Sequence, residues 1–175
     1  MKKTIAILLI IAAVVFVAGC SSNEAPATEN KTPAASANPD QSKEWMQKTS
    51  ADALNVSNAA NELATVLSNQ GNLSQITDLT AYIITESNKT SYESAFYYVN
   101  DDLEPAQQKY ADMMGSYGAF AKRIDMSIAH INSGNTAAAE VTTEDAAESL
   151  TRGNENYAEY KTMIEDFKKK HPDMA

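Results

Sequence analysis

From residue 42 to residue 170, apolar residues recur at intervals of three and four positions. This is the spacing that places side chains on one face of an α-helix. The pattern divides into four segments, which are separated by Gly71, an acidic turn near residue 101, and Gly134. No stretch shows the strict alternation of a half-buried strand. The sequence therefore predicts an all-α protein.

The first two helices are bounded by start and stop signals. The first is expected over about 42–69, because Gly71 follows as a C-terminal stop. Asn72 is then a good cap for a second helix. The apolar face of this helix falters near 87–90 and resumes as far as Val99, so it is either one helix with a break or two helices placed end to end.

The third helix is expected to begin at Asp101 with Pro105 in its first turn, where proline is harmless because that N–H has no helical partner. The fourth is expected from the capping box at 142–145 to about Lys170. Residues 135–140 are read as at most one additional helical turn.

Four amphipathic segments of roughly 28 residues would each be about 42 Å long. Short connections make neighbouring helices antiparallel, and helices of matched length can close around one core. We therefore predict an up-down-up-down antiparallel four-helix bundle over residues 42–175.

The predicted core differs between its two ends. The end that contains the start of the first helix collects aromatic side chains and methionines, and the opposite end is aliphatic. The bland explanation for the aromatic end is packing, with the polar tips of tyrosine and tryptophan reaching water. The alternative is a small-ligand pocket lined by Trp45, Met46, Tyr92, Phe96, Tyr110, Tyr117, Tyr157 and Tyr160.

The first nineteen residues have the layout of a secretory signal. Lys2 and Lys3 precede an unbroken apolar run from Ile5 to Val17. This run is shorter than the roughly 20 residues that a membrane-spanning helix needs. A cleaved signal over 1–19 is therefore preferred to a retained anchor helix.

The sequence Val17-Ala18-Gly19-Cys20 closely resembles the lipobox of prokaryotic lipoproteins. The resemblance covers only the first twenty residues. It implies that the Cys20 thiol carries a diacylglyceryl group and that the chain is cut between Gly19 and Cys20. Two acyl chains give stable membrane anchoring. The resemblance thus implies a protein held by lipid at the extracytoplasmic face of the cell membrane.

Residues 20–41 are rich in Ser, Asn, Pro, Thr and Ala, and they contain no aromatic or large aliphatic side chain. Such a composition cannot bury enough apolar surface to offset the entropy of ordering. The sequence therefore predicts a flexible tether between the lipid and the helical domain.

The charge of the chain excludes one class of partner. Its formal net charge is −9, and removal of Lys2 and Lys3 with the signal leaves 12 basic against 23 acidic side chains. A nucleic-acid binder needs a basic surface, so we expect no nucleic-acid partner. Anionic lipid headgroups would also repel such a domain, so we expect it to stand off the membrane.

The sequence holds few groups for catalysis. It has one cysteine and two histidines, and it contains none of the common hydrolase, zinc-protease or nucleotide-binding motifs. We therefore expect no metal, no cofactor and no enzymatic activity. The leading interpretation is a non-catalytic interaction or scaffold module with a protein partner at the cell envelope.

A remote variant of the ligand hypothesis involves haem. In the predicted topology Met46 and His171 are neighbours at the aromatic end. Their placement resembles the haem-binding methionine and histidine of periplasmic four-helix b-type cytochromes. The resemblance is limited to these two residues and the topology, and core packing of Met46 beside an exposed terminal His171 is the favoured interpretation.

Overall fold

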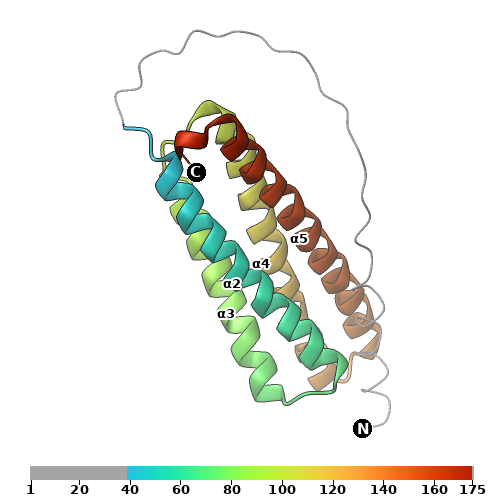
Figure 1. Ribbon diagram of the computed structural model, residues 1–175. Coiled ribbons are helices and arrows are strands. Elements are labelled where there is room, and N and C mark those ends of the chain that lie inside the picture. Colours follow the sequence, from blue (N-terminus) through green and yellow to red (C-terminus); the bar gives the residue numbers. More distant parts are fainter. Residues whose placement is uncertain (1–38, 175) are drawn as a thin grey trace.

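The computed structural model describes residues 39–174 (Figure 1). No strand occurs in this range, which confirms the all-α class. Its elements are α2 (Ser42–Ser68), α3 (Leu73–Ser94), the short 3₁₀ helix η2 (Asp101–Leu103), α4 (Glu104–Asn132), α5 (Thr136–Lys170) and the 3₁₀ helix η3 (Pro172–Met174). Within this range no helix is both long enough and apolar enough to cross a membrane.

Side-chain caps set the starts of two helices. The Asn72 side chain accepts a hydrogen bond from the backbone N–H of Ser74 at 2.8 Å, as expected for the cap of α3. The Asn135 side chain accepts one from the N–H of Ala138 at 3.2 Å and so caps α5. Each bond satisfies a backbone donor that has no partner inside its helix.

The predicted break in the second helix is wrong. α3 runs without interruption from residue 73 to Ser94. The hydroxyl of Thr90 donates to the carbonyl of Glu86 at 2.7 Å, four residues earlier, instead of starting a new helix as a cap. Ser87 donates in the same way to the carbonyl of Ile84 at 3.3 Å. These bonds let polar residues continue the helix.

The predicted continuation of the second helix to Val99 is also wrong. The helix ends at Ser94, and the chain then forms an irregular connection over residues 95–100. Tyr92 and Phe96, which were expected on the buried face, are 69% and 61% exposed. Tyr92 lies inside α3 on the face opposite the buried Thr90 and Ser94, and Phe96 follows beyond the end of the helix.

The fourth helix begins earlier than predicted, at Thr136 instead of Thr142. The hydroxyls of Thr142 and Thr143 donate back to the carbonyls of Ala138 and Ala139, at 2.8 and 2.7 Å. The two threonines therefore lie inside the helix, although their sequence looks like a capping box. With 35 residues, α5 is the longest of the four helices.

Polar side-chain contacts join the ends of different helices at one end of the molecule. At the end where the described chain begins, the Trp45 indole N–H donates to Ser94 Oγ at 2.9 Å, and His171 Nε2 lies 3.2 Å from Asp102 Oδ2. We call this the proximal end; it comprises residues 39–46, 92–110 and 160–174. The distal end comprises residues 64–76 and 124–143.

The helices share one hydrophobic core. α4 packs against the three other long helices, most extensively against α5. The core is polarised as the sequence predicted, with large aromatic rings toward the proximal end and aliphatic side chains toward the distal end. Its largest fully buried side chains are Trp45, Tyr110, Tyr117, Tyr160, Phe120, Leu63, Leu67, Ile83, Leu103, Met113 and Met114.

Candidate functional site

Three aromatic rings fill the proximal core. Trp45 comes from α2, Tyr110 from α4 and Tyr160 from α5, and none is more than 1% exposed. The centroid of the Trp45 ring lies 6.4 Å from that of Tyr110 and 6.2 Å from that of Tyr160, both in edge-to-face geometry. The two tyrosine rings are 5.6 Å apart. These spacings are those of favourable aromatic pairs, so the rings pack against one another.

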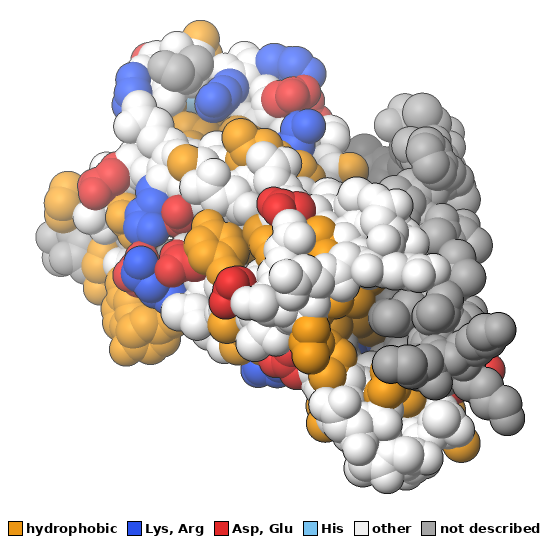
Figure 2. All heavy atoms as spheres, turned by 90° about the horizontal axis from the view of Figure 1, so that it is seen from below, with side chains coloured by type: hydrophobic (Ala, Val, Ile, Leu, Met, Phe, Trp, Pro, Cys, Tyr) orange, Lys and Arg blue, Asp and Glu red, His pale blue; other side chains and the backbone are white. Residues whose placement is uncertain are grey.

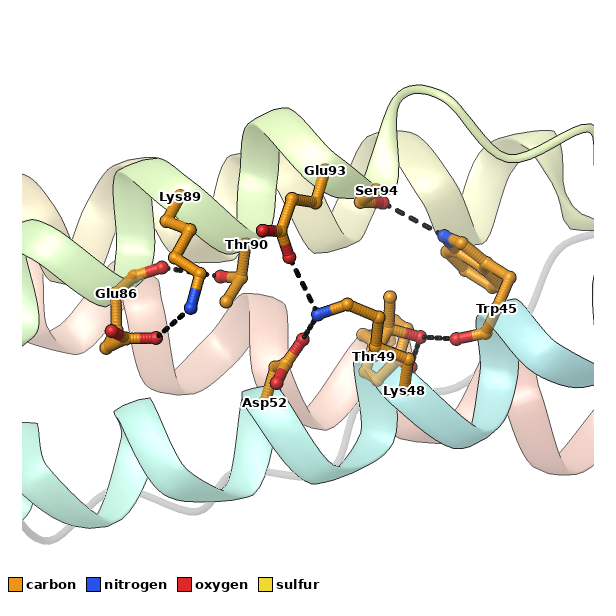
Figure 3. A network of polar contacts seen from close by, with 10 residues as sticks. Trp45, Lys48, Thr49, Asp52, Glu86, Lys89, Thr90, Glu93 and Ser94 are labelled. Atoms are coloured by element: carbon orange, nitrogen blue, oxygen red, sulfur yellow. Dashed lines mark hydrogen bonds and ion pairs between the residues drawn. The ribbon is translucent and has the colours of Figure 1, made fainter.

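Hydrogen bonds hold two of the rings in place (Figure 3). Besides the bond from Trp45 to Ser94, the Thr49 hydroxyl donates to the backbone carbonyl of Trp45 at 2.6 Å. The oxygens of Thr49 and Tyr160 are 2.8 Å apart. Because Thr49 has one hydroxyl proton and uses it on the carbonyl, Tyr160 is the donor in this contact. The buried polar tips therefore join α2 to α3 and α5.

The Tyr110 hydroxyl is the exception. It is buried and has no hydrogen-bond partner among the described residues. Burial raises the pKa of Tyr110 and the nearby Thr90 hydroxyl offsets part of that effect, but no hydrogen bond joins the two groups. Such an unpaired buried group lowers stability.

Burial raises the pKa of the buried phenols. Loss of solvent raises the pKa of Tyr110 and of Tyr160, and it raises the pKa of Tyr117 to about 12. A tyrosine is neutral at pH 7 even in water, so these shifts move the three groups further from ionisation. Tyr117 donates to the side-chain carbonyl of Asn154 at 2.9 Å. Tyr117 and Tyr160 therefore act as hydrogen-bonding parts of the core, whereas the Tyr110 hydroxyl has no such bond.

The structure separates the other predicted pocket residues. Met46 is 2% exposed and belongs to the core. Tyr157 is half-buried, with the Lys161 ammonium 5.3 Å from its ring centroid. Tyr92 and Phe96 are exposed and pack on each other, with centroids 4.8 Å apart. The eight residues predicted from sequence thus divide into five in the packed core, an exposed pair, and the half-buried Tyr157.

The histidine of the haem hypothesis already has close contacts. The ring of His171 stacks on that of Phe167 at 4.3 Å, and its Nε2 contacts the Asp102 carboxylate. One ring face and the outer nitrogen are therefore engaged. Among residues 39–174, no group of three or more His, Cys, Asp or Glu side chains has the arrangement needed to hold a metal ion.

A charged network crosses from α2 to α3 beside the proximal core (Figure 3). Lys48 Nζ lies 2.7 Å from Asp52 Oδ2 and 3.0 Å from Glu93 Oε2. The pKa of Lys48 is raised mainly because Lys48 donates a hydrogen bond to Asp52, and the bond that Lys48 donates to Glu93 lowers the pKa of Glu93. On the face shown in Figure 2, acidic and basic side chains lie beside one another with hydrophobic side chains between them.

The distal end contains a cavity that the sequence did not predict. Its volume is about 230 Å³. The one buried hydroxyl in its wall, Ser127, is already satisfied by Thr143 Oγ1 at 2.7 Å and by the carbonyl of Ala139 at 3.1 Å. The wall is therefore mainly apolar. It is formed by Leu67, Gly71, Leu73, Ile76, Ile124, Ser127, Ile128, Ile131 and Asn132.

Leu73 lines this pocket from the first turn of α3. It was predicted to continue the apolar face of the second helix, but its side chain is 55% exposed.

The predicted lipidation site, Cys20, and the cleavage site at Gly19 lie outside the described residues, as do the predicted signal over 1–19 and nearly all of the predicted tether over 20–41.

Comparison with known proteins identifies no relative: no family model, curated protein or solved structure matches this chain.

Proposed function

We propose that this protein is a lipid-anchored extracytoplasmic module that acts by interaction or as a scaffold at the cell envelope, without catalysis. The observation that carries the proposal is the sequence Val17-Ala18-Gly19-Cys20 after a basic and apolar leader. Cys20 is the one cysteine of the chain. Its position at the end of this leader is where a lipoprotein requires its modified thiol.

The chemistry of the helical domain supports a structural role. The polar atoms of the proximal core link helices: Trp45 binds Ser94, and Tyr160 binds Thr49. The buried phenols are neutral at pH 7, as tyrosines in water are, and burial raises their pKa values further. On the surface, acidic groups such as Glu93 are engaged by lysines. These groups hold the domain together, which suits a rigid body presented to a partner.

The finer topology is part of this proposal. An up-down-up-down antiparallel bundle accounts for the bonds at both ends: Trp45 with Ser94 joins the start of α2 to the end of α3, and Ser127 with Thr143 joins the end of α4 to the start of α5. Spin labels at Gln47 and Lys168 should then be close together. Labels at Gln47 and Gln70 should be about 35 Å apart by helical rise. A large separation for the first pair would contradict the topology.

The anchor is tested in the full chain in a prokaryotic host. We expect the wild type to incorporate labelled fatty acid and to fractionate with membranes, and Cys20→Ser to lose both properties. Ser22→Ala, which leaves the lipobox intact, is the matched control and should behave like the wild type. Unchanged fatty-acid incorporation and fractionation in Cys20→Ser would refute the anchor.

A second candidate function, binding of a small apolar ligand, is favoured by the distal cavity. A volume of roughly 150 Å³ is enough for an apolar cavity to bind benzene. At about 230 Å³ the distal pocket has room for such a molecule, although it is partly open to solvent. Because the Ser127 hydroxyl is already paired, the cavity offers mostly hydrocarbon contacts. The packed rings at the proximal end leave the aromatic pocket without comparable support.

Toluene is a suitable probe of this cavity. A ligand that binds only the folded state raises the melting temperature, so toluene should raise that of the wild type. It should have little effect on Ile131→Phe, in which the added ring occupies the cavity. Equal shifts in the two chains would show that toluene binds elsewhere, and no shift in either would reject the ligand site.

A further inference from the structure

The start of α2 is tied to the connection between α3 and α4. The Gln41 N–H donates to the carbonyl of Tyr98 at 2.8 Å, and the Tyr98 N–H donates to the Gln41 side-chain carbonyl at 3.2 Å. The Asn100 N–H donates to Ser42 Oγ at 2.8 Å. The connection over 95–100 is therefore fixed beside the point where the chain from Cys20 reaches the bundle.

This same region carries exposed aromatic rings. Tyr92 is 69% exposed, Phe96 is 61% and Tyr98 is 56%. We call these three side chains the proximal patch. Tyr82 is the other large aromatic side chain that is exposed in the described part of the chain. At the distal end the large exposed apolar side chains are the aliphatic Leu73 and Val141 together with Met126. Exposed aromatic surface is thus concentrated at the proximal end.

We infer that the proximal patch docks the bundle onto the bilayer interface that holds the lipid on Cys20; the inference rests on the proposed lipid anchor. Tyrosine rings have an apolar body and a polar tip, and they favour the headgroup region of membranes. Phe96 adds an apolar ring in contact with Tyr92. The patch therefore has the composition of an interfacial contact, and it lies where the anchored chain joins the domain.

With the proposed lipid anchor in place, the proximal patch needs only a weak affinity of its own to keep the domain on the membrane. The 21 peptide units from Cys20 to Gln41 can span at most about 75 Å when fully extended. The tether predicted for residues 20–41 would keep the domain at an effective concentration near the membrane that is far above its bulk value. Three exposed rings then need only a modest affinity to hold the proximal end against the bilayer.

Charge decides which lipid surface fits. The proximal end carries exposed charges of both signs, among them Asp101, Asp102 and the lysines at 168–170, and the whole chain is acidic. Zwitterionic headgroups accommodate both signs, whereas anionic headgroups would repel the net negative charge of the chain. The expected surface is therefore a zwitterionic bilayer such as phosphatidylcholine. The net charge taken alone predicts that the domain stands off the membrane, whereas the local aromatic surface favours contact at this one end.

The test uses the full lipidated chain in phosphatidylcholine vesicles that contain a fluorescent acceptor lipid. A donor dye is attached to one introduced cysteine, either Ala95→Cys at the proximal end or Ser133→Cys at the distal end. The distal position lies about 40 Å farther along the bundle by helical rise. Docking predicts energy transfer at least about twofold higher from Ala95→Cys than from Ser133→Cys, because the transfer falls off over a distance comparable to the length of the bundle.

Two further variants identify the contact. Tyr92→Ser combined with Phe96→Ser and Tyr98→Ser should reduce the difference in energy transfer between the two donor positions. Because these side chains are exposed, folding should be retained. Leu73→Ser combined with Val141→Ser alters equally exposed apolar side chains at the other end and should leave the difference unchanged.

Flotation of the same vesicles separates the two proposals. A chain that floats but transfers energy equally from both positions, or is insensitive to the triple change, overturns membrane docking and leaves the anchor intact; the patch would then be available to a protein partner. A chain that does not float overturns the anchor and with it the docking.

Discussion

At the proximal end the space between α2, α4 and α5 is filled by three interlocking rings, whereas at the distal end the space beside α2, α3 and α4 retains a cavity of about 230 Å³. The proximal rings are also fixed by hydrogen bonds from Trp45 and Tyr160. At the distal end the Ser127 hydroxyl bonds to α5 and leaves the cavity wall apolar. The same four helices are thus rigidly packed at one end and have unfilled space at the other.

This difference assigns different roles to the two ends. A tightly packed, hydrogen-bonded core suits the end at which the described chain begins and at which aromatic rings are exposed. Unfilled apolar space suits an end that can accept another molecule, since such a cavity lacks the packing contacts that fill a native core. The following changes test the comparison, from the largest expected effect to the smallest, in a Cys20→Ser background.

Trp45→Ala should cause the largest loss. Its ring is fully buried, touches Tyr110 and Tyr160, and bonds to Ser94, so truncation should cost about 3–5 kcal/mol of unfolding free energy. Ile76→Ala beside the distal cavity should cost less, about 2 kcal/mol, because little packing is lost there. Urea unfolding followed by circular dichroism measures both losses. Fluorescence does not serve here, because Trp45 is the one tryptophan and Trp45→Ala removes it. Equal losses would refute the difference in packing.

Two glycines extend the comparison to the middle of the bundle. A Cβ at Gly153 would lie 2.7 Å from the ring of Tyr117, which is fully buried. Gly153→Ala should therefore destabilise by about 1–2 kcal/mol, because the crowding outweighs the gain in helix propensity. At exposed Gly115 a Cβ would have no atom within 4 Å, so Gly115→Ala should stabilise by about 0.5–1 kcal/mol. Changes of the same sign in thermal unfolding would contradict the close contact at Gly153.

The two proximal tyrosines separate ring packing from hydrogen bonding. Tyr160→Phe removes the bond to Thr49 and should cost about 0.5–1.5 kcal/mol. Tyr110→Phe removes a buried hydroxyl without a partner, so stability should stay the same or rise by up to about 1 kcal/mol. Chemical unfolding of the two single variants and the double variant measures this. A clear loss in Tyr110→Phe would mean that its hydroxyl has a partner.

The smallest expected effect concerns the charged network between α2 and α3, in which Lys48 pairs with Glu93. The bond from Lys48 lowers the pKa of Glu93 below 4.5, so its contribution is present above pH 4.5 and is lost as the pH falls through the folded-state pKa. Glu93→Gln should therefore flatten the fall in melting temperature on acidification. Lys48→Met should flatten it similarly, because it removes the same pair. An unchanged acid limb in both variants would show that the pair does not contribute to stability.

The sequence predicted the helices well where apolar spacing was unbroken. The stripe of α2, including Ala53, Val56 and Leu63, is buried as expected, and Gly71 and Asn72 mark the turn between α2 and α3. Hydroxyl residues caused the boundary errors. Thr90 and Thr142 can either cap a helix or bond back to a carbonyl inside it, and only the tertiary packing decides between the two.

The candidate sites were harder to predict. Trp45, Tyr110 and Tyr160 come together at the proximal end, whereas Tyr117 and Tyr157 lie outside it. Periodicity also did not show that Tyr92 and Phe96 are exposed. The distal cavity lies among three helices. The volume of a pocket depends on how side chains from several helices pack in three dimensions. The spacing of apolar residues along the sequence does not determine it.

The most direct test of the central claim is the intact mass of the protein purified from its own membranes. The account predicts a chain that begins at Cys20 and carries the added mass of a diacylglyceryl group on that residue. A chain that begins at Met1, or one whose Cys20 thiol is free and alkylatable, would contradict the lipid anchor and the membrane docking derived from it.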